Sequence, residues 1–397
     1  MMTEHSIEVV ERLRDILRRR GLSQREFARL TGKTEAEVSR WLSGSMGISK
    51  ANIRKLEAVL NEPLTADSTF VSEIKTLRIG MIGTGSIASR FVQEVPHVSD
   101  CVVTAVYNPY LVETIEFCKR YEISKIANTL QELFEVSDAI YVASPIATHY
   151  EYAKKALENG KHVICEMPFT QTMQEAEELY DIARRANLVL LPALKTAYCP
   201  SFIQLIDIVE SGEIGQLIDV TATVTQLLPP QTSLEFSNER LLENSTYVLL
   251  AAFKLFGPQY KKVHVHTVYE QRDDLVTESQ APIGTKAIYS HIILEYGDRT
   301  ASLKTGVGVK SEGSLVISGT KGYVYIPAPW WKTDYFEVRY ENQNDNKKYF
   351  FPYESSGLRY EIEAFRNAVM NKSRFRVRLT REENLKMIKI QSMIVNS

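Results

Sequence analysis

The sequence predicts an α/β protein preceded by a small all-α head. Residues 1–62 contain four short amphipathic helical patterns, separated by Gly and by Ser or Thr at the helix starts. From residue 77 on, apolar strand patterns alternate with helical patterns at the spacing of βαβ units, which predicts a parallel sheet. The 397 residues exceed the roughly 250–300 at which a single core stops growing, so two or three domains are expected.

The composition is that of an ordinary globular protein, with 44% hydrophobic and 24% charged residues. The formal net charge of -2 argues against nucleic-acid binding by the chain as a whole. Residues 1–62 hold 12 Lys+Arg against 9 Asp+Glu, while the remainder holds 35 against 40. Any DNA contact is therefore expected in the N-terminal part.

The cysteines and the apolar runs narrow the class of protein. Cys101, Cys118, Cys165 and Cys199 lie far apart without a CxxC pair, which argues against a disulfide framework and a zinc site. No cluster of metal-binding residue types emerges elsewhere, so no metal is expected. No stretch approaches about 18 uncharged apolar residues, and the N-terminal pattern lacks an apolar export signal. A cytoplasmic protein without membrane contact is expected.

The head contains a predicted helix-turn-helix. Residues 7–17 form an amphipathic pattern with arginines on the opposite face, and Gly21 ends it. Ser23-Gln24-Arg25-Glu26 is a capping box that starts a second helix, which ends at Gly32. Thr34 caps a third helix, and Ser49 caps a fourth helix whose apolar face includes Ile53 and Leu60. Two short helices joined at a glycine are typical of the helix-turn-helix unit.

The string Leu22-Ser23-Gln24-x-Glu26-x-Ala28-x-x-x-Gly32, followed by Val38-Ser39-Arg40-Trp41 and Gly44, resembles the Xre/Cro phage-repressor class. The resemblance implies a double-stranded DNA partner, with the major groove faced by Gln24, Lys33, Thr34, Glu35, Ala36, Glu37 and Arg40. Arg40 is suited to guanine and Glu35 to cytosine. The alternative is a helical bundle for docking or dimerisation, because Glu35 and Glu37 weaken the positive charge of this surface.

A dinucleotide-binding turn is predicted at the start of the body. Residues 77–82 form an apolar strand that runs into a glycine-rich turn and a helix through Val92; the turn is Gly83, Thr84, Gly85, Ser86 and Ile87. The glycines allow backbone N–H groups to approach a pyrophosphate at the helix N-terminus. NAD or NADP is the expected cofactor, and a tight turn that binds nothing is the alternative.

The position expected to contact the adenosine ribose is Asn108, which ends the second predicted strand. Asn108 carries no carboxylate to repel a 2′-phosphate, and the residue after it is Pro109 rather than an arginine. The choice between NAD and NADP therefore stays open at the level of the sequence.

Further motifs are similar to those of the Gfo/Idh/MocA oxidoreductase family over about residues 77–397. They are Ser144-Pro145 with Thr148-His149, residues 156–168 (ALENGKHVICEMP), residues 211–215 (SGEIG), Leu255-Phe256-Gly257 and residues 319–323 (GTKGY). The resemblance implies hydride transfer between NAD(P) and sugars, cyclitols or related compounds. It adds Ser144, Pro145 and Glu166 to the cofactor site.

The periodicity of the sequence and the two resemblances together imply the domain boundaries. They are residues 1–62 for the head, 63–76 for a linker, 77–194 for a Rossmann-type parallel-sheet domain, and 195–397 for an α/β substrate and oligomerisation domain with an open, mostly antiparallel sheet. A homo-oligomer, dimer or tetramer, is expected.

The residues for proton transfer depart from the family pattern. The family's catalytic Lys position is Met167, and the position of its downstream His is Tyr247. Glu243 replaces the usual Asp, and Ile146 replaces an Asn near the nicotinamide end of the cofactor. The nucleotide pocket is therefore better preserved than the residues for the chemistry.

Substitute proton carriers are available among the residues expected to line the cleft. Lys195 and Tyr247, together with Glu166, are the candidate catalytic residues, and Tyr198 lies in the same segment as Lys195. A lysine beside a tyrosine can lower the pKa of the phenol enough for acid/base work. The alternative is that Lys195 binds an anion or pairs with Glu166. Packing is favoured over sugar stacking for Trp330 and Trp331.

Three functions compete at this stage. The first is a transcription regulator whose body senses a dinucleotide, a sugar or both. The second is an active NAD(P)-dependent sugar or nucleotide-sugar dehydrogenase with Lys195 or Tyr247 as an unusual proton carrier. The third is a scaffold that binds neither DNA nor cofactor.

Overall fold

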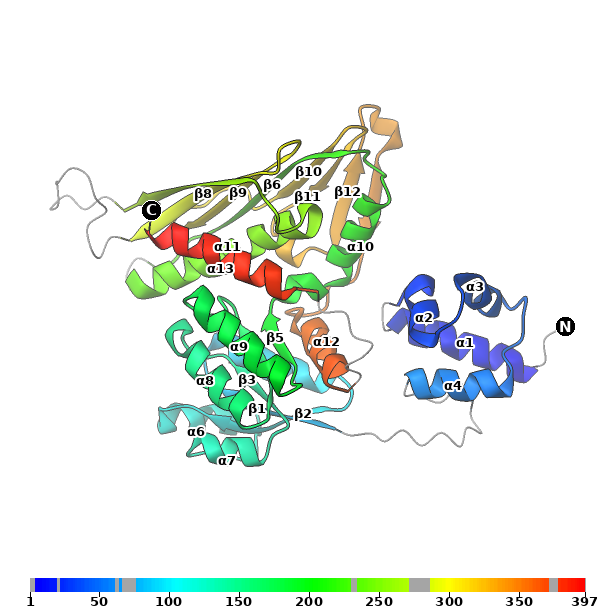
Figure 1. Ribbon diagram of the computed structural model, residues 1–397, viewed down its shortest axis with the longest axis horizontal. Helices are drawn as coiled ribbons and strands as arrows, with labels where there is room; N and C mark the ends of the chain where they lie inside the picture. The colour runs from blue at the N-terminus through cyan, green and yellow to red at the C-terminus, as the bar shows by residue number, and fades with distance from the viewer. Residues whose placement is uncertain are drawn as a thin grey trace. The chain divides into compact units, whose positions relative to one another are not determined.

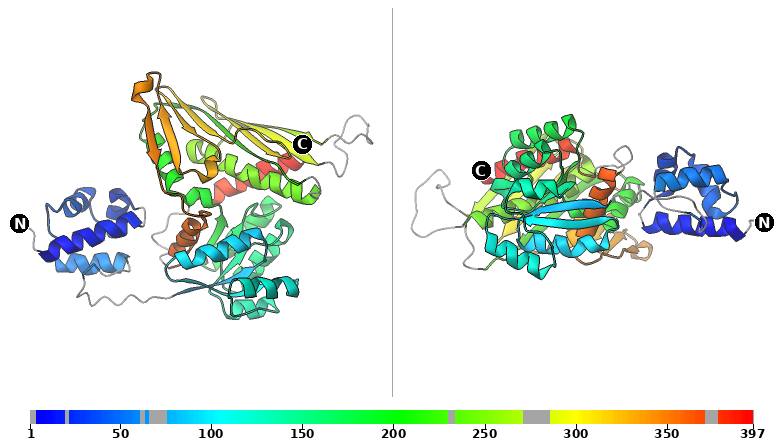
Figure 2. Two further views of the ribbon diagram at one scale, coloured as in Figure 1. Left: turned by 180° about the vertical axis from the view of Figure 1, so that it is seen from behind. Right: turned by 90° about the horizontal axis from the view of Figure 1, so that it is seen from below.

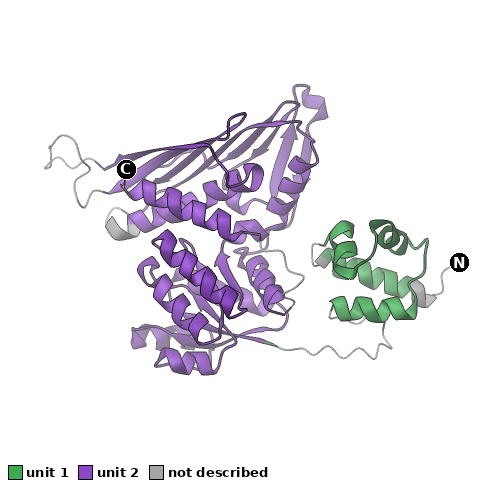
Figure 3. Cartoon of the chain, in the orientation of Figure 1, with its two compact units in different colours: residues 1–76 green, residues 77–397 purple. Residues whose placement is uncertain are grey.

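The computed structural model describes residues 4–19, 22–60, 64–65, 76–229, 234–270, 286–370 and 378–396. The chain divides into two compact units, Met1–Thr76 and Leu77–Ser397 (Figure 3). Of the predicted linker, only Leu64, Thr65 and Thr76 are described, and Gly21 also lies outside the described residues.

The first unit is all-α, as the sequence predicts. Its helices are α1 (Glu4–Arg19), α2 (Gln24–Thr31), α3 (Glu35–Ser43) and α4 (Lys50–Leu60) (Figure 1). Ser23 and Thr34 both form complete capping boxes, with Glu26 and Glu37 respectively. Gly32 ends α2 in the left-handed conformation, with φ of 64°, and Trp41 lies buried between the helices. The helix-turn-helix prediction is confirmed.

The second unit begins with a five-stranded parallel sheet. The strands are β1 (Leu77–Ile82), β2 (Cys101–Tyr107), β3 (Ala139–Val142), β4 (His162–Glu166) and β5 (Leu190–Ala193), in the order β2-β1-β3-β4-β5. The connecting segments are α5 (Ser86–Glu94), η1 (Val95–His97), α6 (Leu111–Arg120), α7 (Leu130–Glu135), α8 (Ile146–Glu158) and α9 (Met173–Arg185). Helices cover both faces, which is why β3 and β5 are buried along their whole length. The predicted Rossmann-type sheet is confirmed.

The rest of the second unit carries an eight-stranded sheet of order β13-β12-β11-β10-β6-β9-β8-β7. Its strands are β6 (Leu217–Gln226), β7 (Lys262–Tyr269), β8 (Ala287–Glu295), β9 (Thr300–Val307), β10 (Leu315–Gly319), β11 (Tyr323–Ile326), β12 (Tyr335–Arg339) and β13 (Lys347–Phe350). Within it β6 and β9 pair in parallel, while the other neighbouring pairs are antiparallel. The prediction of a mostly antiparallel sheet is confirmed.

Helices cover one face of this sheet. They are α10 (Pro200–Glu210), α11 (Leu234–Phe256) and α13 (Arg381–Asn396), drawn in Figures 1 and 2 on the side that faces the parallel sheet. The short helices η2 (Lys195–Tyr198), η3 (Trp330–Lys332) and η4 (Gln343–Asp345) complete this part of the chain. Trp330 packs inside it, and its indole N–H donates to the Thr223 carbonyl at 3.1 Å, as expected for a packing residue.

Helix α12 (Leu358–Met370) joins the two sheet systems by packing against both α5 and η2. The Glu94 carboxylate at the end of α5 accepts hydrogen bonds from the Ser356 backbone N–H at 2.9 Å and from the Arg359 guanidinium at 2.7 Å. Burial alone would raise the pKa of Glu94, but the bonds from Ser356 and Arg359 outweigh it and hold the pKa at about 2.

Among the described residues, no helix is long and apolar enough to cross a membrane. The same residues contain no group of three or more His, Cys, Asp or Glu side chains placed to hold a metal ion.

We expect Glu94→Gln to lower the free energy of unfolding by roughly 2 kcal/mol, because it removes the buried carboxylate that accepts from Ser356 and Arg359 and leaves Arg359 with the exposed Glu354 as its ion-pair partner. The native pKa lies below the ordinary value of 4.5, so this stabilisation is complete above pH 4.5 and disappears as the pH falls toward 2. Urea denaturation at pH 7 and pH 3 measures both effects. Glu116→Gln, at an exposed position of α6, is the control, and an equal loss in both variants would contradict the assignment.

Candidate functional site

The turn between β1 and α5 has the shape of a phosphate cradle. Gly83 has φ of 107°, and a Cβ placed on it would lie 2.3 Å from the Ala143 carbonyl oxygen. A Cβ on Gly85 would instead meet open space. Helix α5 then begins at Ser86 without a side-chain cap, so its first N–H groups are available to an anion. The residues present therefore fit the pyrophosphate of a dinucleotide.

The ribose end of this pocket is organised around Asn108, which directly follows β2. Its side-chain amide donates to the Thr84 hydroxyl at 2.7 Å and to the Glu113 carboxylate at 3.2 Å. Asn108 therefore links the glycine turn to the first turn of α6. It also places a carboxylate beside the predicted ribose position, which the sequence alone does not indicate.

Ser144 and Pro145 lie in the loop between β3 and α8. The Ser144 hydroxyl accepts from Thr148 at 2.8 Å, and Pro145 immediately precedes the first residue of α8. His149 is buried, with its ring nitrogens 2.9 Å from the Pro168 carbonyl and 2.7 Å from the Ser144 carbonyl. His149 is therefore a structural residue of this loop, as its position after Thr148 suggests.

Glu166 ends β4 and carries an unusual ionisation. The Tyr141 hydroxyl donates to one of its carboxylate oxygens at 2.5 Å. Burial raises the pKa of Glu166; the Tyr141 hydrogen bond opposes this, the negative charge of Glu243 adds to it, and the pKa settles at about 7. Glu166 can therefore exchange a proton near neutral pH.

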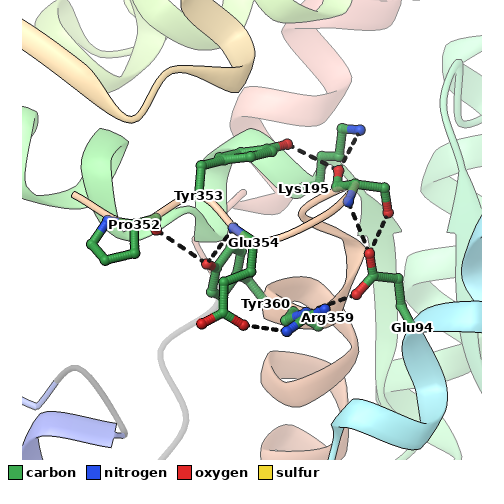
Figure 4. Close-up of polar contacts among 8 residues, drawn as sticks. Glu94, Lys195, Pro352, Tyr353, Glu354, Arg359 and Tyr360 are labelled. Carbon is green, nitrogen blue, oxygen red and sulfur yellow. Dashed lines mark hydrogen bonds and ion pairs between the residues drawn. The ribbon is translucent and has the colours of Figure 1, made fainter. Parts of the chain in front are cut away.

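Lys195 is nearly fully buried, and its ammonium donates to the Ser356 carbonyl at 2.8 Å (Figure 4). The Tyr353 hydroxyl donates to the same carbonyl at 2.9 Å. The charge of Lys195 lies close enough to Glu166 to oppose the rise of its pKa. Lys195 and Glu166 thus belong to one electrostatic site, in which a backbone carbonyl positions the ammonium.

The expectation that Lys195 lowers the pKa of a neighbouring phenol is wrong. Burial raises the pKa of Tyr198, and the charge of Glu361 adds to the rise. Burial also raises the pKa of Tyr247, where Glu243 and Glu166 add to the effect. Both phenols are enclosed in low-dielectric surroundings near carboxylates, so they keep their protons at neutral pH. Neither is suited to serve as a base there.

Comparison with known proteins assigns the body of the chain. A family model described as an oxidoreductase family with an NAD-binding Rossmann fold matches residues 77–194. A scyllo-inositol 2-dehydrogenase (NADP(+)) of Bacillus subtilis is 30% identical over 229 residues, which cover 54% of this chain and 69% of that protein. The chain belongs to the Gfo/Idh/MocA oxidoreductase family. NAD or NADP as its cofactor is thereby confirmed.

Further matches agree with this assignment. A helix-turn-helix family model matches residues 13–66. A dTDP-3,4-didehydro-2,6-dideoxy-alpha-D-glucose 3-reductase of Saccharopolyspora spinosa is 33% identical over 192 residues, covering 46% of this chain and 58% of that protein. A 3-ketoreductase from Actinomadura kijaniata, solved with TDP-benzene and NADP, shares the fold with a TM-score of 0.66 and 22% identity, covering 80% of this chain and 96% of that one.

Three residues that are expected to depart from the Gfo/Idh/MocA pattern lie in the described part of the chain. Met167, which the sequence analysis expects at the position of the family's lysine, has its side chain buried in the hydrophobic core. The Glu243 carboxylate, in place of the family's Asp, pairs with Arg240 one helical turn away. Ile146 is buried at the first position of α8.

The structure also brings in residues that the sequence analysis did not select. Tyr141 lies within an apolar strand, and Glu361 lies on α12, where both carboxylate oxygens are buried without a hydrogen-bond partner. Burial raises the pKa of Glu361, and the charge of Glu166 raises it further. In the sequence, Tyr141 and Glu361 are visible only as polar residues within apolar patterns. Such a pattern does not reveal which residue the polar group will contact.

We expect Glu166→Gln to flatten the dependence of unfolding free energy on pH between pH 4.5 and 7. A raised native pKa means that the protonated form is favoured, so the wild type loses stability as the pH rises through this range, by up to roughly 3 kcal/mol. Urea denaturation at pH 5 and pH 8 measures the difference. Identical pH profiles for Glu166→Gln and the wild type would refute the raised pKa.

Proposed function

We propose that this protein is a transcription regulator whose Gfo/Idh/MocA body binds NAD or NADP together with a sugar-like ligand. One contrast carries the proposal. The dinucleotide turn is open at Gly85, whereas Met167 fills the lysine position with a buried apolar side chain. A body that retains its nucleotide pocket without its usual proton carrier is suited to sensing.

The surface of the head supports DNA as the partner. Thr34 and Glu37 are engaged with each other in the capping box, and Lys33 pairs with Glu37 at 3.8 Å. Glu35 and Arg40 remain exposed on α3. Base reading therefore falls to these two side chains, with Gln24 and Ala36 beside them, and Thr34 and Lys33 have supporting roles.

A homo-oligomer would allow a ligand bound to the body to control DNA binding by the head. Two copies joined through their bodies would present two heads, and a two-fold arrangement of heads matches a palindromic operator. A ligand that changes the spacing of the heads would then change the affinity for DNA.

A second candidate function is an active sugar dehydrogenase. The observation that favours it is the Glu166 pKa of about 7, which suits a general base at neutral pH. The relatives include enzymes named for scyllo-inositol and dTDP-sugar substrates. Reduction of NAD by a panel of sugars, lost in Glu166→Gln, would establish this function.

We expect Arg40→Ala to weaken binding to DNA from upstream of the protein's own gene by about 5- to 150-fold, because one base contact of this kind contributes roughly 1–3 kcal/mol. Arg54→Ala, at an exposed position of α4, is the control for lost positive charge. Gel retardation at fixed moderate salt measures both. Equal losses would assign the effect to net charge, and no retardation of wild type would contradict the regulator.

We expect the protein to prefer NAD over NADP, because Glu113 lies beside Asn108 and repels a 2′-phosphate that carries nearly two negative charges. Glu113→Gln should lower the ratio of the NADP to the NAD dissociation constant about tenfold. Fluorescence titration with NADH and NADPH measures the ratio, with Glu116→Gln as the control on the same helix. A wild type that binds both equally would refute the preference.

A further inference from the structure

The register of the parallel sheet places Glu166 in one row with the dinucleotide turn. Ile82 of β1 is in register with Tyr107 of β2 and with Val142 of β3. Val142 is in turn in register with Cys165 of β4. The residues that follow these four positions are therefore neighbours along the carboxyl edge of the sheet. In order across the sheet they are Asn108, Gly83, Ala143 and Glu166.

This row sets the direction in which a dinucleotide lies. Ligands of such sheets bind beyond the carboxyl ends of the strands, where the strand order reverses, which here is between β1 and β3. Asn108 is expected at the adenosine ribose and Gly83 at the pyrophosphate, so the cofactor runs from β2 toward β1. Its nicotinamide half then continues past β3 toward Glu166 at the end of β4.

Glu166 is held at this edge in a defined orientation. Cys165 and Met167 on either side of it are buried, whereas Glu166 is only partly covered. The Tyr141 hydroxyl donates to its Oε1 at 2.5 Å. The ring of Tyr141 is fully buried and stacks on Phe91 of α5, with ring centroids 3.7 Å apart and planes at 12°. The stack fixes the phenol, and the phenol fixes the carboxylate.

Other charged and titratable groups act on Glu166 from the elements around it. Desolvation raises its pKa to about 7. The hydrogen bond from Tyr141 and the charge of Lys195 on η2 both favour the carboxylate. The Lys195 ammonium is itself bound to the Ser356 carbonyl. The remaining titratable groups that interact with this site are Glu243, Glu361, Tyr247 and Cys165.

We propose that the Glu166 carboxylate, positioned by Tyr141, favours the oxidised dinucleotide over the reduced one. The nicotinamide ring of oxidised NAD is a cation, and the ring of NADH is neutral because it has gained a hydride. A carboxylate attracts the cationic ring and gains little from the neutral one. The body then responds to the redox state of the cofactor. The inference rests on the proposed function and deepens it, because it names the signal that the body senses.

The test is calorimetric titration of the full-length protein with oxidised NAD and with NADH, at pH 6 and pH 8.5 and constant ionic strength. An attraction of about tenfold that acts only on ionised Glu166 raises the ratio of the NADH to the NAD dissociation constant about fivefold over this range. Glu166→Gln should make the ratio independent of pH.

The matched control lies on the outer helices of the parallel sheet. Glu178 is an exposed carboxylate of α9 that also accepts from a tyrosine, with the Tyr150 hydroxyl at 2.6 Å. Glu178→Gln should keep the rise of the ratio with pH. A rise lost equally in Glu178→Gln and Glu166→Gln would overturn the inference.

Tyr141→Phe tests the positioning residue. It removes a bond that favours the carboxylate, so the pKa of Glu166 rises and the midpoint of the pH profile moves to higher pH. A merely structural role would weaken binding of both forms equally at every pH. Tyr150→Phe is the control and should leave the profile unchanged. A Tyr141→Phe profile with the wild-type midpoint would overturn the role of Tyr141.

The outcomes separate the inference from the proposed function. A wild-type ratio that does not change with pH, or a rise that survives in Glu166→Gln, would overturn the redox preference. NAD binding and DNA retardation by the wild type would then still support the regulator. Failure of the wild type to bind either form of the cofactor would refute the proposed function itself. The wild-type profile needs no variant, so it decides even where a variant does not fold.

Discussion

The buried Glu94 carboxylate is the interaction on which the arrangement of the site depends. It ends the helix that follows the dinucleotide turn, and it is bound by the Ser356 backbone and by Arg359 of α12. The Ser356 carbonyl in turn receives the Lys195 ammonium. One charge thus fixes the parallel-sheet part against the segment that positions the buried lysine. Removing a partner from such an ion pair costs more than the pair itself contributes, because an unpaired charge remains buried.

Burial decides which groups near the cleft can move protons. The Tyr247 phenol is enclosed close to carboxylates, so it keeps its proton. Burial also raises the pKa of Glu166 to about 7, because desolvation disfavours the charged carboxylate. The hydrogen bond from Tyr141 offsets only part of this effect. The lysine position itself holds the buried Met167. This combination is the basis of the proposed sensing function, and Glu166 is the proposed proton carrier of the alternative function.

Charge also sets the character of the ribose end of the cofactor site. At the ribose end, Glu113 supplies a carboxylate through its bond with Asn108. The expected preference for NAD thus comes from the local negative field of this carboxylate.

The sequence by itself determined the elements whose cause is local. Ser23-x-x-Glu26 and Thr34-x-x-Glu37 set two helix starts in the head, and Gly83 and Gly85 set the turn after an apolar strand. The resemblance of its motifs also identified the family, and it implied that Met167 and Tyr247 stand at the family's lysine and histidine positions. Only the tertiary structure decided that Glu113 reaches Asn108 and that Glu361 is buried near Glu166. The reason is physical: a cap or a turn depends on neighbouring residues, whereas a pKa or a charge cluster depends on dielectric surroundings built from segments that are distant in the chain.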